Sequence, residues 1–325
     1  MNQKSIHTPA LWFVGLFYLL FIGCRNETGA DWAAYLDMYE RIRWYSFTDA
    51  LEYTEISFAI LNWLLGQIDA GVIVVNIIAA IFFVSGLIRF AQKMPNPWLA
   101  LISVTPYLVI AIGMSAVRQS MAIGLVFHLF ASWQQSLFKK ISLASIATSF
   151  HYSAIVALIF VVQSIKMPSW FRYTLLVGGA VVSYPIFNAT EAYSKYNQTY
   201  IVDDIVSPGA FMHALLNAIP AIIYLLFIKK WNAVFGKSDL IRILAILSIF
   251  SVFGVFVSST GIDRLALYLS PIQMLVYSSM PYVFGRKNQS ILYSLIITYH
   301  GIVLYWWLNY ANTSMGWIPY KNILF

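Results

Sequence analysis

Apolar segments of membrane-spanning length recur from one end of this 325-residue chain to the other. Three clear examples are 71-GVIVVNIIAAIFFVSGLI-88, 211-FMHALLNAIPAIIYLLFI-228 and 289-QSILYSLIITYHGIVLYWWL-308. An α-helix needs about 20 such residues to cross the hydrocarbon core of a bilayer. The segments do not alternate between polar and apolar residues, as the strands of a membrane β-barrel would. They predict an all-α, polytopic transmembrane helical bundle.

The composition agrees with a chain that is solvated mostly by lipid. Only 10% of the residues are charged and 60% are hydrophobic, whereas about a quarter of a soluble domain is charged. The single cysteine, Cys24, excludes an intrachain disulfide and a cysteine-based zinc site. Cys24 follows a basic start and an apolar run, as in a lipoprotein signal, but Phe21 fits that signal poorly. We therefore expect an uncleaved first helix.

The basic residues are sorted into alternate loops. Thirteen of the twenty Lys and Arg fall in six segments that hold a single acid, Asp239. Because cytoplasmic loops retain Lys and Arg, we interpret the net charge of +7 as a topology signal and predict no nucleic-acid binding. The sequence predicts about 11 crossings (9–12), a cytoplasmic N-terminus and periplasmic loops at about 25–52 and 189–210. We treat 1–325 as a single integral membrane domain.

Two segments do not fit a simple count of crossings. One helix over the 25 mostly apolar residues 141–165 would reverse the side on which the later basic residues lie. We therefore predict two short helices that meet near His151 on the outer side. The segment 53–67 is too short to span the bilayer comfortably, and we predict a re-entrant or interfacial helix there.

Two arginines lie where topology rules disfavour positive charge. Arg118, in 114-MSAVRQSMAIGLVFHLF-130, and Arg264 both fall at predicted outer helix heads, and Tyr268 lies one turn beyond Arg264. A snorkelling anchor would explain Arg118, and pairing with Asp263 would explain Arg264. However, two guanidinium groups at helix N-termini suit phosphate binding. We predict an outward-facing site for a lipid-linked phosphate or diphosphate.

His151 is predicted to lie level with both arginines, which favours a functional role over packing. His128, His213 and His300 have no such setting, and we interpret them as packing residues. The histidines and acids of the chain do not show a metal-ligand spacing, and we predict neither a metal nor a cofactor.

The first outer loop, 25-RNETGADWAAYLDMYERIRWY-45, combines acids, arginines and aromatic side chains. Carboxylates suit sugar hydroxyls, and aromatic rings suit the CH faces of sugars. An amphipathic surface helix over 32–47 would explain most of this loop, but it does not explain Arg25 or Asp31. Glu55 is a further anomaly, because it lies inside an apolar run.

Several of these residues carry a family resemblance that runs in order along nearly the whole chain. The motifs are Arg25, Gly29, Asp31, Trp32 and Tyr35, then 55-EISFAILNWLL-65, 118-RQSMAIG-124, 150-FHYSA-154, 264-RLALY-268 and 317-WIPYKN-322. Together they resemble the EpsG family of Wzy-like polysaccharide polymerases. The family implies a multi-pass protein of the bacterial inner membrane that polymerises undecaprenyl-diphosphate-linked repeat units on the periplasmic face. The product would be O-antigen, capsule or exopolysaccharide.

The resemblance also implies roles for individual residues and partners. Arg118 and Arg264 would bind the donor's diphosphate and stabilise it as a leaving group, His151 would assist or act as the base, and Asp31 would position sugar or share the base role. The substrates would be a lipid-linked glycan donor and a lipid-linked acceptor, and a chain-length regulator and a flippase would be pathway partners. The substrate-binding candidates are Arg25, Trp32, Tyr35, Glu55, Gln119, Tyr268, Trp317 and Tyr320.

Three other functions stay open at this point. A flippase for lipid-linked oligosaccharides would also bind a diphosphate lipid, although it should show inverted repeats and polar groups that reach the midplane. An O-antigen ligase uses similar chemistry on a different acceptor. A membrane O-acetyltransferase would need a cytoplasmic acyl-donor site, and nothing in the sequence resembles one.

Overall fold

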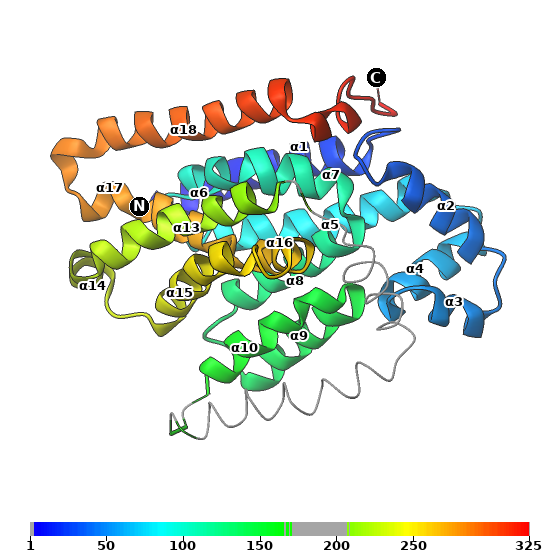
Figure 1. The fold of residues 1–325 in the computed structure, drawn as a ribbon, viewed down its shortest axis with the longest axis horizontal. Helices are drawn as coiled ribbons and strands as arrows, with labels where there is room; N and C mark the ends of the chain where they lie inside the picture. The colour runs from blue at the N-terminus through cyan, green and yellow to red at the C-terminus, as the bar shows by residue number, and fades with distance from the viewer. Residues whose placement is uncertain (1–2, 166, 169, 171–206, 208, 325) are drawn as a thin grey trace. The chain divides into compact units, whose positions relative to one another are not determined.

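The computed structural model describes residues 3–165, 167–168, 170, 207 and 209–324. Within this part of the chain the regular structure is helical (Figure 1), and the only extended pairing is an isolated bridge between Arg25 and Asn322. The chain divides into two compact units: unit 1 comprises 1–155 and 277–325, and unit 2 comprises 156–276. The predicted loop at 189–210 falls mostly outside the described residues.

Unit 1 contains most of the helices. Their bounds are α1 (Gln3–Gly23), α2 (Trp32–Ile42), α3 (Phe47–Tyr53), α4 (Ile56–Gly66), α5 (Val72–Ala91), α6 (Pro97–Val104), the π-helix η1 (Thr105–Ile112), α7 (Gly113–Ser115), α8 (Val117–Ala131), α9 (Leu137–Phe150), η2 (Tyr152–Ile155), η5 (Arg286–Asn288), α18 (Gln289–Tyr310) and η6 (Asn312–Gly316). The helix α17 (Pro271–Val283) links the two units.

Unit 2 contains α10 (Val156–Gln163), α13 (Ala210–Leu226), α14 (Ile228–Phe235), α15 (Asp239–Gly254), α16 (Ser259–Ala266) and the 3-10 turn η4 (Leu267–Leu269). Within it, α13 packs against α15 and α16.

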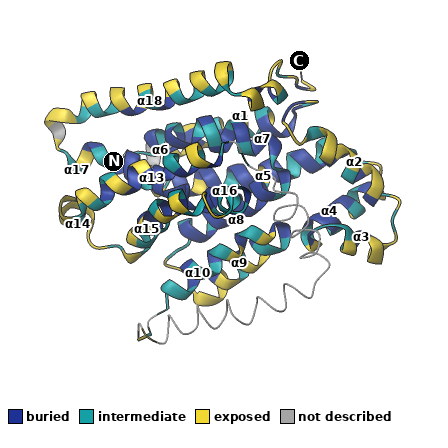
Figure 2. Cartoon of the chain, in the orientation of Figure 1, coloured by how far each residue is buried: buried dark blue, intermediate teal, exposed yellow. Residues whose placement is uncertain are grey.

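The core of unit 1 is built around α5, which packs against both α1 and α8. Figure 2 shows buried residues concentrated along α5 and α8. These two helices approach each other through glycines: a Cβ added at Gly86 would lie 2.0 Å from the Gly124 carbonyl oxygen, and a Cβ at Gly124 would lie 2.2 Å from the Phe82 carbonyl oxygen. Small residues allow such close backbone approach between apolar helices. This crossing fixes α8, and therefore the residues at its start, against α5.

The long apolar helices fall where the sequence predicts them. Among the described residues, α5, α18 and the continuous segment 97–115 are long and apolar enough to cross a membrane. The helices α13 and α14, bent by 79°, form a fourth such segment if the pair is one span. The other apolar helices are shorter, so the count of about 11 crossings and the orientation stay predictions. On α18, exposed apolar side chains such as Ile291 and Ile302 suit contact with lipid.

The predicted interruptions are also present. Helix α9 ends at Phe150, and His151 adopts extended backbone angles before the turn η2 begins. The helix α4 has 11 residues, which gives it a length of about 16 Å and makes it too short to cross the hydrocarbon core. The amphipathic helix over 32–47, the alternative explanation of the first outer loop, is present as α2, which ends earlier, at Ile42.

The C-terminal residues pack against the first loop. The backbone N–H of Asn26 donates to the Lys321 carbonyl at 3.0 Å, and that of Gly29 donates to the Gly316 carbonyl at 2.7 Å. These two parts of the chain therefore lie at the same end of unit 1. That this end of unit 1 lies outside stays a prediction.

The topology gives a direct prediction for thiol labelling. Single cysteines at Asn26, Asn312 and Thr199, the last of which lies outside the described residues, should react with a membrane-impermeant thiol reagent added from outside. A cysteine at Gln134, which follows the opposite end of α8 from Arg118, should react only after permeabilisation. The native Cys24 is buried, and replacing it with serine removes any background labelling from its thiol. Labelling at Gln134 in sealed cells would reverse the orientation.

Candidate functional site

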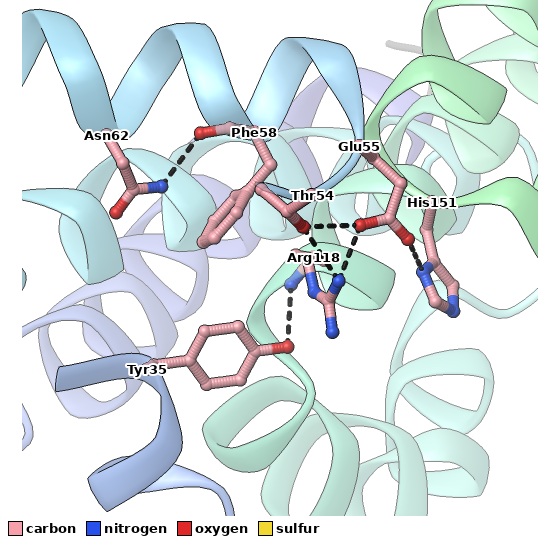
Figure 3. A network of polar contacts seen from close by, with 7 residues as sticks. All are labelled: Tyr35, Thr54, Glu55, Phe58, Asn62, Arg118 and His151. Atoms are coloured by element: carbon pink, nitrogen blue, oxygen red, sulfur yellow. Dashed lines mark hydrogen bonds and ion pairs between the residues drawn. The ribbon is translucent and has the colours of Figure 1, made fainter. Parts of the chain in front are cut away.

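Four helix ends meet at one polar cluster in unit 1 (Figure 3). Thr54 follows α3, Glu55 precedes α4, Arg118 is the second residue of α8, and His151 follows α9. Helix ends leave backbone groups without intrahelical partners, so these positions are natural places for polar side chains. We refer to Thr54, Glu55, Arg118 and His151 as the Glu55 cluster.

Glu55 is the centre of the cluster and is buried, with 4% of its surface exposed. Its Oε2 accepts from Arg118 Nη1 at 2.5 Å and from the Thr54 hydroxyl at 2.8 Å. Its Oε1 lies 2.7 Å from Nδ1 of His151. Arg118 Nη1 also donates to the Thr54 hydroxyl at 2.9 Å. Both carboxylate oxygens are thus held, and each ties together segments that are far apart in sequence.

The electrostatics of the cluster favour an ionised Glu55. Burial alone would raise the pKa of this carboxyl, but the hydrogen bond from His151 and the positive charge of Arg118 together hold the pKa well below its usual range. Because removing one partner of a buried ion pair leaves an uncompensated charge, Glu55 and Arg118 depend on each other. The pair fixes the guanidinium at the N-terminal end of α8.

Arg118 retains hydrogen-bonding capacity beyond this pair. Glu55 and Thr54 bond to Nη1 and not to Nη2, whereas Nε is buried without a hydrogen-bond partner among the described residues. The side chain is 26% exposed. The Tyr35 hydroxyl accepts from the backbone N–H of Arg118 at 3.3 Å, and the guanidinium carbon lies 5.8 Å from the centre of the Tyr35 ring. A positioned, partly exposed guanidinium at a helix N-terminus can bind an anion.

Asp31 lies four residues before Tyr35, whose hydroxyl contacts Arg118. It precedes α2, is exposed, and exchanges two hydrogen bonds with Ser115: its backbone N–H donates to Ser115 Oγ at 3.2 Å, and that hydroxyl donates to Asp31 Oδ2 at 3.0 Å. Tyr35 follows one turn later on α2 and donates its N–H to the Asp31 carbonyl. An exposed carboxylate held in this way could accept hydrogen bonds from sugar hydroxyls.

Arg264 belongs to unit 2, and its position differs from the prediction. The helix α16 ends at Ala266, so Arg264 lies in its last turn and not at a helix head. The C-terminal end of a helix carries partial negative charge, so the dipole argument for phosphate binding holds at Arg118 and fails at Arg264. Tyr268, in the following turn η4, is buried.

The sequence comparisons bear directly on this geometry. Residues 10–322 match the EpsG family, a stretch that includes every residue of the Glu55 cluster. The chain belongs to the EpsG family. Neither a curated protein nor a solved structure matches it significantly. Membership of the EpsG family is consistent with an exopolysaccharide or Wzy-like polymerase, and together with the apolar helices it supports a membrane protein of polysaccharide biosynthesis.

In this EpsG protein the structure brings together several residues singled out from the sequence: Tyr35, Glu55, Arg118 and His151. Gln119, next to Arg118, is buried, and its Nε2 lies 3.5 Å from the Ser153 hydroxyl. Thr54 was not among the sequence candidates. A threonine before a glutamate gives no signal of its own, and its role emerges only from the contact with Arg118.

A second set of candidates lies around the C-terminal segment. Arg25 is 2% exposed and donates to the Ile22 carbonyl at 2.5 Å and to Asn76 Oδ1 at 3.1 Å. Burial lowers the pKa of Arg25 to about 10, so it stays charged at neutral pH. Its bond to the last turn of α1 suits a cation at a helix C-terminus. The described hydrogen bonds of Arg25 therefore cap α1 and tie its end to α5.

The aromatic candidates of this set also bond to protein groups. Trp32 faces the Arg25 guanidinium, 6.0 Å from its ring centre. Trp317 Nε1 donates to the Ile110 carbonyl at 3.0 Å, and the Tyr320 hydroxyl donates to the Phe21 carbonyl at 2.7 Å. These bonds hold the C-terminal segment to η1 and α1, which explains the buried position of Trp317.

The histidines interpreted as packing residues divide into two kinds. His128 and His300 make single bonds, to the Ser85 hydroxyl at 3.0 Å and the Ile296 carbonyl at 2.8 Å. For His213 the interpretation is incomplete, because its Nδ1 lies 2.8 Å from Oδ1 of Asp263. The two residues are 50 positions apart, so no local pattern reveals the pair. Among the described residues, no three His, Cys, Asp or Glu side chains gather as metal ligands would.

Proposed function

We propose that this protein is a glycosyltransferase that polymerises undecaprenyl-diphosphate-linked oligosaccharide units on the outer face of the bacterial inner membrane. The observation that carries the proposal is the Arg118–Glu55 pair. A buried carboxylate fixes a partly exposed guanidinium at a helix N-terminus in a chain of the EpsG family. Such a group suits a phosphate that must bind tightly and then leave.

In the proposed reaction an acceptor hydroxyl attacks the anomeric carbon of the donor glycan. The bond from that carbon to the diphosphate breaks, and the lipid diphosphate leaves with the electron pair. Arg118 stabilises the charge that develops on the diphosphate, and Arg264 is proposed as a second ligand on the sequence argument alone. The proton of the acceptor hydroxyl passes to His151, which is bonded to Glu55, or to Asp31, which otherwise positions the sugar while His151 assists.

The donor and acceptor are then both diphosphate lipids, and a flippase must supply them from the cytoplasmic face. A chain-length regulator is a further proposed partner. The same Arg118 pair could serve a flippase, which would bind the diphosphate without breaking a bond. A polymerase and a flippase can be distinguished by the glycan intermediate that accumulates in cells lacking the protein.

Deleting the gene should leave surface glycan present as single repeat units on its normal acceptor, because transport and ligation continue while polymerisation stops. Gel ladders of the surface glycan measure this, and a plasmid copy of the gene should restore long chains. Lipid-linked units that accumulate on the cytoplasmic face, with no glycan at the surface, would instead identify a flippase. Long chains in the deletion strain would contradict both functions.

A further inference from the structure

Asp31 occupies the N-cap position of α2 but does not cap that helix. Aspartate is a preferred N-cap residue because its carboxylate accepts from backbone N–H groups of the first turn. The Asp31 side chain makes no such bond, and its backbone angles, φ −94° and ψ 8°, are not those of a usual N-cap. Its Oδ2 accepts instead from the Ser115 hydroxyl at 3.0 Å, and its backbone N–H donates to the same hydroxyl oxygen at 3.2 Å. Helix capping therefore does not account for this carboxylate.

The backbone around Asp31 is fixed against the start of α8. Gly29 has a φ of 106°, and a Cβ added there would lie 2.3 Å from the carbonyl oxygen of the residue before Ser115. One turn beyond Asp31, the Tyr35 hydroxyl accepts from the backbone N–H of Arg118 (Figure 3). The contacts of Asp31 with Ser115 and of Tyr35 with Arg118 follow the same order along both segments. They hold the Asp31 carboxylate beside the N-terminal end of α8.

The carboxylates of Glu55 and Asp31 differ in their partners. Glu55 is buried, and its two oxygens are bonded to Thr54, Arg118 and His151. A carboxylate held by such donors is a poor proton acceptor. Asp31 is exposed, and within the described part of the chain its Oδ1 has no bonded partner. Because Glu55 balances the charge of Arg118, the carboxylate of Asp31 is held in position and can still take up a proton.

His151 is the other candidate for the proton of the acceptor hydroxyl. Its side chain is 9% exposed, and its Nδ1 lies 2.7 Å from Oε1 of Glu55. This bond makes Glu55 a shared partner of His151 and Arg118, which suits a group that holds the guanidinium in place. A general base must come within hydrogen-bond distance of the hydroxyl that it deprotonates. The exposed carboxylate of Asp31 can be reached by a bulky glycan acceptor more readily than the buried imidazole.

The positions of Asp31 and Arg118 also bear on the stereochemistry of transfer. In a single displacement the base and the leaving group lie on opposite faces of the anomeric carbon, and the configuration inverts. Asp31 and Arg118 are both fixed by contacts between α2 and the start of α8, but they do not bond to each other, because the guanidinium pairs with Glu55. The two groups can therefore act on opposite sides of the reacting carbon.

We propose that Asp31 is the general base of the glycosyl transfer, that Ser115 is its positioning residue, and that the transfer inverts the anomeric configuration. The assignment rests on the proposed polymerase function. Oδ1 of Asp31 takes the proton of the acceptor hydroxyl as that oxygen bonds to the anomeric carbon. The bond between this carbon and the diphosphate breaks on the opposite face, and the lipid diphosphate leaves with the electron pair. The carboxylic acid then releases its proton to water.

The kinetic test uses the full-length protein in lipid nanodiscs and the lipid-linked repeat units that the deletion strain accumulates. Asp31→Asn keeps the shape and can still accept from Ser115. It should lower kcat by roughly 100- to 10,000-fold, the contribution of a positioned base, while KM stays within about threefold. Ser115→Ala should lower kcat roughly tenfold or more at a similar KM, because the base loses its orientation. Asp37→Asn, the same change at an exposed α2 carboxylate that pairs with Arg41, should keep full activity.

The stereochemical test compares the substrate with the product of the wild-type protein. NMR coupling constants at the reacting anomeric carbon give its configuration in the lipid-linked unit and in the polymer. We expect the two configurations to be opposite. The same configuration in both would overturn the proposal, because a retained configuration requires two displacements, with a nucleophile in place of a base.

The alternative is that Asp31 only positions sugar or ties α2 to α8. In that case a folded Asp31→Asn protein would keep kcat within about threefold of wild type, or would show a raised KM with an unchanged kcat. Either result overturns the assignment. If Asp31→Asn does not accumulate, Ser115→Ala decides, and a wild-type kcat in that folded variant overturns the assignment too. Wild-type protein that extends no units would instead refute the proposed function itself.

Discussion

Replacing Arg118 with lysine should remove most chain extension while the protein still accumulates in the membrane. Lysine keeps the positive charge that the buried Glu55 carboxylate requires, so folding should be retained. It cannot, however, bond Glu55 and also present further donors to a phosphate in a planar fork. A charge-assisted contact of this kind contributes about 2–4 kcal/mol, or roughly 30- to 1000-fold in rate. Glycan ladders and immunoblots for abundance measure the two effects separately.

Arg118→Ala should be inactive, but it also leaves Glu55 buried without its cation, at a cost of about 3–5 kcal/mol. Pairing it with Glu55→Gln removes both charges, and this double variant should regain abundance without regaining activity. Arg43→Lys is a matched control, because the Arg43 side chain has the same 26% exposure and pairs with Glu40 and Asp69 on the loop side of unit 1. If Arg118→Lys still makes full-length glycan ladders, Arg118 does not bind the diphosphate and its role is to balance the charge of Glu55.

The apolar helices and the breaks between them could be predicted from the sequence, because each is determined by residues that are close together in the chain. The run at 71–88 becomes α5, and the break at His151 is found where the polar residue interrupts the apolar segment. The helix head predicted at Arg264 failed for a local reason too. The helix α16 ends at Ala266, and the 3-10 turn that follows leads into Pro271, which cannot continue a helix from the preceding turn.

The contacts of the candidate site could not be predicted in the same way. Glu55 is 63 residues from Arg118 and 96 residues from His151, and the sequence marks each of them only as a polar residue in an apolar setting. It does not show that one carboxylate satisfies both partners. The pair of His213 and Asp263 was missed because Asp263 has a nearer candidate partner in Arg264, next to it in the chain. In the structure the two Asp263 carboxylate oxygens bond to Ser207 and to His213.

The crossing of α5 and α8 gives a second prediction with a large expected effect, on stability. Gly124→Ala places a methyl group 2.2 Å from the Phe82 carbonyl oxygen, and Gly86→Ala places one 2.0 Å from the Gly124 carbonyl oxygen. The obstacle is backbone, so no rotamer change can relieve it. Each variant should destabilise the protein by roughly 3 kcal/mol, the upper end of the usual cost of overpacking, and should displace α8, which carries Arg118. Thermal unfolding in detergent and abundance in the membrane measure the effect.

Gly301→Ala supplies the matched control for this prediction. Gly301 lies inside α18, and a Cβ added there meets nothing within 4 Å. Because alanine favours a helix over glycine by about 1 kcal/mol, this variant should unfold at the same temperature as the wild type or slightly higher. Glycine-to-alanine substitution is therefore expected to lower the unfolding temperature at Gly124 and to keep or raise it at Gly301. Both glycines are helical, and they differ in how closely neighbouring atoms pack against them. Wild-type stability in Gly124→Ala would show that α5 and α8 do not cross at these glycines, and the position of Arg118 beside Glu55 would lose its support.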